Sequence, residues 1–85
     1  MIDALAPGIW IEDHAFAREF HTRVALTDKG IERDYNNPTG ALIMPIPGVL
    51  SVSVTRYSVT ILKSPMFTWE EMTPAILERI PCEIL

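Results

Sequence analysis

The sequence predicts a small α+β domain: a three- to four-stranded sheet, antiparallel or mixed, with two short helices packed on one face. Apolar and polar residues alternate with a period of two in residues 20–27, 50–55 and 58–63, which is typical of strands with one buried face. Two capping signals directly precede apolar residues and mark helix starts. Seven prolines among 85 residues keep the elements short. The length suits a single domain, 1–85.

Residues 1–18 are expected to form an irregular N-terminal segment that includes a short extended stretch at 9–11. Asp13 is suited to cap a short helix over residues 14–20, in which Phe16 and Phe20, four residues apart, would share one face. A competing interpretation extends the following strand back to Phe20. The sequence leaves both open.

The alternation from Phe20 predicts a strand that ends near Thr27. Asp28-Lys29-Gly30 then supplies a turn, with glycine suited to the left-handed position of a three-residue hairpin loop. Residues 31–35 would be a short, charged return arm at the edge of the sheet.

Asn36-Asn37-Pro38 predicts the first helix, because a capping side chain stands directly before a proline at the first helical position. The helix carries the apolar residues Ala41, Leu42 and Met44. It must end before Pro45, which cannot continue it.

A hairpin follows, with strands at 50–55 and 58–63 and a tight turn at Arg56-Tyr57. Thr68-x-x-Glu71 is a capping-box pattern that opens the last helix. At Thr73-Pro74 this helix either restarts or kinks. Ile76, Leu77 and Ile80 form its apolar stripe, and Pro81 ends it.

Composition excludes several function classes. The net charge of −4 and the scattered basic residues argue against nucleic acid and against an anionic membrane surface. We find neither a stretch of about 20 apolar residues nor a basic-then-apolar leader, so a cytoplasmic protein is expected. The single cysteine, Cys82, excludes an internal disulfide and a Cys-x-x-Cys motif.

Two blocks carry a family resemblance. Residues 46–63 read Ile-x-Gly-Val-x-x-Val and then Val-Thr-Ile-x-Lys, and residues 69–80 read Trp-x-x-Met-x-Pro-x-Ile-Leu-x-x-Ile. In order and internal spacing they resemble the N-terminal domain of NifU-like iron–sulfur scaffold proteins. The resemblance covers residues 46–80, about two-fifths of the chain.

The sequence also departs from that family. It lacks the opening Asn-Pro-Asn segment, Ser58 replaces a bulky aromatic residue, and Thr55 and Tyr57 replace the turn glycine and aspartate. The Cys-x-x-Cys pair of these scaffolds lies in a separate domain, and this chain has no such pair. The resemblance therefore implies the fold and a non-catalytic protein-binding role, accessory to iron–sulfur cluster assembly or delivery.

Three sets of residues carry groups that could be reactive. Cys82 follows a helix C-terminus and precedes Glu83, surroundings that disfavour a thiolate, although one ligand to a cluster shared between subunits stays open. His14 and His21 lie near Glu12 and Asp13, but the expected helix–strand boundary separates the histidines and no further ligand group is evident. No metal ion or other cofactor is therefore expected.

The serines at 51, 53 and 58 occupy outward strand positions without a strained elbow, so no catalytic residues are assigned and the chain is not expected to be an enzyme. An enzyme would need a pocket that joins His14 or His21 to a carboxylate. A copper-binding plait domain is the nearest competing resemblance, but the loop that would carry its Met-x-Cys-x-x-Cys motif reads Asp28-Lys29-Gly30 here.

Tyr57 and Trp69 are the candidate partner-binding residues, because exposed aromatic side chains dominate many interfaces. Trp10 is expected to cover one side of the sheet, and Met44, Met66 and Met72 to fill the core. The main alternative is a small structural or interaction protein of an unrelated pathway, either a homo-oligomer or an adaptor, that uses the same fold.

Overall fold

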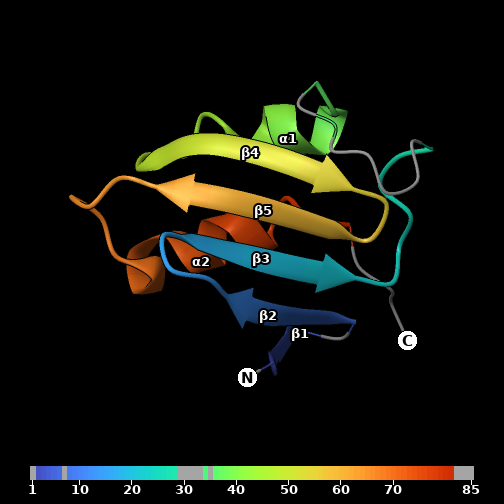
Figure 1. The fold of residues 1–85 in the computed structure, drawn as a ribbon, viewed down its shortest axis with the longest axis horizontal. Helices are drawn as coiled ribbons and strands as arrows, with labels where there is room; N and C mark the ends of the chain where they lie inside the picture. Colours follow the sequence, from blue (N-terminus) through green and yellow to red (C-terminus); the bar gives the residue numbers. More distant parts are fainter. Residues whose placement is uncertain (1, 7, 29–33, 35, 82–85) are drawn as a thin grey trace.

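The computed structural model describes the backbone of residues 2–6 and the full residues 8–28, 34 and 36–81. Five antiparallel strands form one sheet in the order β1-β2-β3-β5-β4 (Figure 1). The strands are β1 (Ile2–Ala6), β2 (Ile9–Asp13), β3 (Ala17–Thr22), β4 (Val49–Thr55) and β5 (Ser58–Lys63), and the helices are α1 (Pro38–Ile43) and α2 (Trp69–Leu77).

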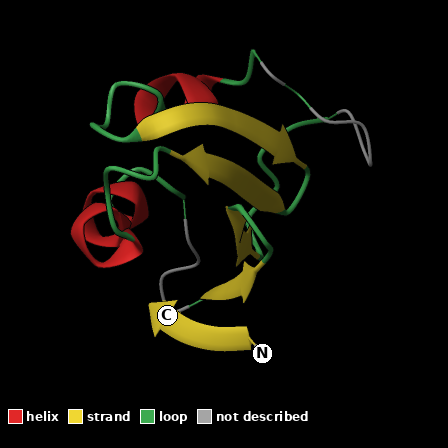
Figure 2. Cartoon of the chain, turned by 60° about the vertical axis from the view of Figure 1, so that its left-hand side comes forward, coloured by secondary structure: helices red, strands yellow, loops and turns green. Residues whose placement is uncertain are grey.

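Both helices lie on the same side of the sheet (Figures 1 and 2). The predicted α+β class, with two short helices on one face, is thus confirmed. The sheet has one strand more than the three or four expected, because β1 pairs with β2. We call the face without a helix the open face.

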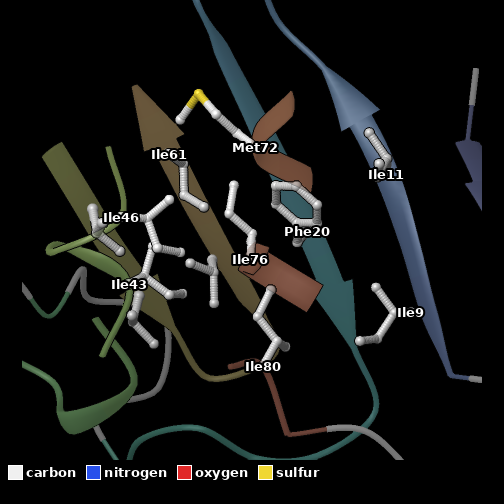
Figure 3. Packing of buried hydrophobic residues seen from close by; sticks show 12 residues of the cluster. Ile9, Ile11, Phe20, Ile43, Ile46, Ile61, Met72, Ile76 and Ile80 are labelled. Carbon is white, nitrogen blue, oxygen red and sulfur yellow. The ribbon is translucent and has the colours of Figure 1, made fainter. Parts of the chain in front are cut away.

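The core lies between the sheet and the helices (Figure 3). Ile11, Phe20, Val59 and Val54 are successive cross-strand partners from β2 to β4, so they form one apolar row on the helix-bearing face. Residues from both helices and their flanking turns pack on this row and complete the core: Ile43, Ile46, Met72, Ile76 and Ile80.

The extended stretch expected at residues 9–11 is confirmed as part of β2. The expected irregular structure of the rest of residues 1–18 is wrong where the chain is described, since β1 and the start of β3 also lie there. The alternative helix over residues 14–20 is also wrong. Phe16 and Phe20, four residues apart, do not share a helix face: Phe20 is fully buried and Phe16 is 81% exposed in the turn after β2. Pairing of β3 with both β2 and β5 outweighs the local helical spacing.

The first predicted strand begins earlier and ends earlier than expected, at Thr22 rather than near Thr27. Beyond Thr22 the chain runs past the β4–β5 turn, where the Leu26 amide donates to the Arg56 carbonyl at 2.7 Å. Of the expected return arm, residues 31–33 and 35 lie outside the described residues, as do Lys29 and Gly30 of the turn. Asp34 pairs with Val54 of β4 and not with the strand predicted to begin at Phe20.

The first helix is confirmed in its start and its end. Asn37 caps it and Pro38 is its first residue, while Met44 closes it before Pro45. Its buried face differs from the expected one, since Thr39, Gly40 and Ile43 are buried and Leu42 is 59% exposed. Gly40 lies where α1 packs against β4: a Cβ there would lie 3.5 Å from Val52, an ordinary contact distance.

The β4–β5 hairpin and the capping box of α2 are confirmed. Leu50 is exposed although the alternation placed it with Val52 and Val54, because an irregularity between Val49 and Ser51 shifts the register. Pro74 lies inside α2 and neither restarts nor ends it. Among the described residues no helix is long and apolar enough to cross a membrane, and α2 has only nine residues.

Candidate functional site

Four titratable side chains gather on the open face at β2 and β3. Glu12 is the direct cross-strand partner of Glu19. His21 lies two residues beyond Glu19 on β3, and strand alternation therefore places its side chain on the same face. His14 joins from the turn after β2, where its amide donates to the Ala17 carbonyl at 2.9 Å. We call these four residues the His–Glu cluster.

The imidazoles and carboxylates of the cluster lie within about contact distance of one another. The Nε2 atom of His14 lies 3.0 Å from Glu19 Oε1 and 3.8 Å from Glu12 Oε2. The Nε2 atom of His21 lies 3.2 Å from Glu12 Oε1 and 3.7 Å from Glu19 Oε1. Each imidazole therefore faces both carboxylates.

The ring of His21 is held from its other side. Trp10 is its cross-strand partner, and the two rings stack with centroids 5.7 Å apart and planes 10° apart. Trp10 thus lies on the open face, where it fixes the orientation of one histidine of the cluster.

Glu19 is the least exposed member of the cluster. Burial by itself would raise the pKa of its carboxyl, but hydrogen bonds from His14 and Ser58 and the charges of His21 and His14 together lower the pKa below the usual glutamate value. Glu19 is therefore ionised at neutral pH and available as a ligand.

The expectation that His14 and His21 lie apart is wrong. No helix–strand boundary separates His14 from His21, and Glu19 supplies the third group that the sequence reading lacked. Glu12 was correctly placed near the histidines, whereas Asp13 points elsewhere and pairs with Arg18 at 2.7 Å. Only the β2–β3 register could have revealed Glu19.

Trp69 and Tyr57, the two predicted partner-binding residues, lie at opposite ends of the sheet (Figure 1). Trp69 begins α2 beside the end of β5, whereas Tyr57 lies in the β4–β5 turn and is 50% exposed. They cannot form one contact point. Each remains a separate candidate.

Trp69 is half-buried and flanked by two cations. Arg18 lies 5.1 Å and the Lys63 ammonium 5.8 Å from the centre of its ring. A wide, open depression of about 590 Å³ adjoins it, lined by Arg18, Thr68, Trp69, Glu70, Thr73 and Pro74. An aromatic ring with cations close to it can contact apolar groups of a partner, and the cations can contact acidic groups.

The same end of the sheet carries a set of exposed apolar side chains that sequence reasoning missed. We call it the apolar end: Phe16, Leu50, Leu62 and Met66. The register places Leu62 beside Ala17 and Ser51, which brings the β2–β3 turn and the start of β4 together. Met66, expected in the core, is 85% exposed because it follows Pro65 in the loop before α2.

The remaining candidate residues lie apart from the ligand atoms of the cluster, except Ser58, which hydrogen-bonds to Glu19. The Ser58 hydroxyl also lies 2.6 Å from Thr55 Oγ1. Ser53 and Ser58, which were expected to face outward, are both buried. Met72 is buried in the core as expected, while Met44 is exposed at the end of α1. Cys82 lies outside the described residues.

Comparison with known proteins found no match among family models, curated proteins or solved structures.

Proposed function

We propose that this chain is a non-catalytic protein-binding module, similar to the NifU-like N-terminal domain and accessory to iron–sulfur cluster assembly or delivery. The apolar end is the observation that carries the binding role. Its four large exposed side chains come from three separate segments of the chain, at the end of the sheet where α2 begins. Exposed apolar side chains gathered at one end of a small domain are characteristic of an interaction site.

The surroundings of the apolar end indicate the chemistry of the partner. Trp69 offers an aromatic ring with two cations, Arg18 and Lys63, close to it. Tryptophan and arginine are the residues that most often dominate binding energy at interfaces. The partner should therefore present apolar side chains with acidic groups beside them.

The pathway rests on the resemblance of residues 46–80 to the NifU-like domain. Iron–sulfur clusters are held by cysteine thiolates. With Cys82 as its single cysteine, the chain would leave cluster coordination to its partner.

Affinity capture from a lysate tests this role. The wild-type chain should retain a cluster-assembly or cluster-containing protein, identified by mass spectrometry. The double variant Phe16→Ser/Met66→Ser should lose it, because both side chains are almost fully exposed and their removal changes the surface without opening the core. Leu42→Ser, an exposed apolar position on α1, is the matched control and should retain the partner.

Recovery of no such protein, or equal recovery with the double variant, would count against the proposal. A cluster reconstituted on the isolated chain, seen as strong visible absorbance, would refute its non-coordinating part.

A homo-oligomeric or adaptor role in an unrelated pathway is the second candidate, and the sheet edge favours it. β1 is an edge strand of five residues without a lysine or proline to block further pairing. Light scattering discriminates between the two functions. A stable dimer would favour the second, and a strict monomer at high concentration would weaken it.

A further inference from the structure

We propose that Glu12, His14 and Glu19 bind one divalent metal ion of the zinc type on the open face. Each residue offers one ligand atom, and these atoms all lie within 4.8 Å of one another. This site shares no residue with the apolar end, so the inference goes beyond the protein-binding role and does not depend on it.

Two of the three separations between ligand atoms are close to those of a small tetrahedral ion. Zinc lies about 2.0–2.2 Å from nitrogen and oxygen ligands, so two ligands of a tetrahedral site are about 3.3–3.6 Å apart. The Nε2 atom of His14 lies 3.0 Å from Glu19 Oε1 and 3.8 Å from Glu12 Oε2, one separation below that value and one above it. Small side-chain rotations therefore bring both pairs to the required distance.

His21 acts as a positioning residue for Glu12. Its Nε2 atom lies 3.2 Å from Oε1 of Glu12, which leaves Oε2, the oxygen that faces His14, to the metal. The stack on Trp10 holds the His21 ring in this orientation. Such outer hydrogen bonds orient metal ligands and raise their affinity.

The charges of the cluster also favour a cation. Glu12 and Glu19 are direct cross-strand partners, so two negative charges lie close together on the open face. A divalent ion would neutralise the pair while the neutral imidazole of His14 supplies the third ligand. His14 and Glu12 are partly exposed, so water can reach a fourth position, as in open zinc sites.

Calorimetric titration of Zn²⁺ into the untagged chain at neutral pH tests the site. The chain carries Cys82→Ser so that no thiol competes for the ion. We expect one zinc ion per chain. Glu19→Gln and His14→Ala should each abolish measurable binding, and His21→Ala should weaken it roughly tenfold, as the loss of an outer partner does.

Asp13→Asn is the matched control. It removes a neighbouring carboxylate that pairs with Arg18 on the other face of β2, so zinc affinity should not change. Circular dichroism of each metal-free variant shows whether it is folded. If one of the two ligand variants does not fold, the other still provides the test.

Absence of binding to the parent chain would overturn the proposal. So would undiminished binding by a folded His14→Ala or Glu19→Gln variant, or an equal loss in Asp13→Asn, because the last result would mean that the ion responds only to overall negative charge.

Discussion

Gly48 shows how one residue type can be dictated by its position. It joins α1 to β4 with a φ of +96°, a conformation that side chains with a Cβ rarely adopt. A Cβ there would also meet Phe67 at 2.7 Å and the Met72 sulfur at 3.0 Å. Both backbone conformation and packing therefore require glycine at this turn.

Gly48→Ala should lower the free energy of unfolding by about 2 kcal/mol, since strained backbone at one residue costs about 1–3 kcal/mol. Gly40→Ala is the matched control: it lies in α1, and its Cβ would meet Val52 at an ordinary 3.5 Å. That variant should be as stable as the wild type or more so, because alanine favours helix. Urea unfolding of both variants measures the difference, and equal losses would contradict the role assigned to Gly48.

The ionised Glu19 side chain contributes to the free energy of unfolding through its contacts in the His–Glu cluster. Its pKa is lower in the folded chain than in the unfolded one, so its contribution is complete above the unfolded value of about 4.3 and is lost as the pH falls through the folded value. In EDTA, Glu19→Gln should be less stable than the wild type at neutral pH. It should also lose less stability on acidification. Urea unfolding of the wild type and the variant from neutral to acidic pH measures both differences. If the free energy of unfolding falls in parallel in the two proteins, ionised Glu19 does not stabilise the fold.

At the level of elements, the two helix caps have different surroundings. Asn37 is buried, and its side chain accepts from the Thr39 amide and donates to the Leu26 carbonyl, each at 2.9 Å. It therefore caps α1 and also fastens the chain that follows β3. Thr68 caps α2 through an exposed capping box with Glu71.

Thr68→Ala should cost about 1 kcal/mol of unfolding free energy, the usual value of an exposed cap. Asn37→Ala should cost at least about twice that, because it also leaves the Leu26 carbonyl without its donor. Denaturant unfolding of the two variants compares them directly. Equal losses would mean that the bond to Leu26 adds nothing.

At the scale of the whole molecule, one core joins the N-terminal strands to the C-terminal helix. Ile9 and Ile11 of β2 belong to the same buried cluster as Met72 and Ile76 of α2. A hydrogen bond of 2.8 Å from the Thr22 hydroxyl to the Pro81 carbonyl ties β3 to the chain beyond α2. Unfolding of the N-terminal strands would therefore expose the core residues of α2, and unfolding of α2 would expose those of the strands.

The described domain should therefore unfold in one transition. Trp10 on β2 and Trp69 on α2 report on the two halves. The single-tryptophan variants Trp69→Phe and Trp10→Phe should each show the same urea midpoint by fluorescence and by circular dichroism. If, within either variant, the fluorescence of the remaining tryptophan changes at a different urea concentration from the circular dichroism, the two halves unfold separately.

The sequence predicted the elements whose signals are local. Asn37-Pro38, the β4–β5 alternation and the Thr68 capping box depend on residues within a few positions of one another, so their types and approximate bounds could be read directly. The α+β class followed from them. At residues 14–20 the apolar spacing was compatible with both a helix and a strand, so the local pattern left two interpretations open.

Only the tertiary structure decided how the N-terminal strands pair and that the His–Glu cluster forms. β3 forms because β2 and β5 pair with it on either side, a stabilisation that no local pattern contains. The same register sets Glu19 opposite Glu12 and brings both histidines to them. The composition specified which chemical groups the chain has, and long-range strand pairing determined which of them meet.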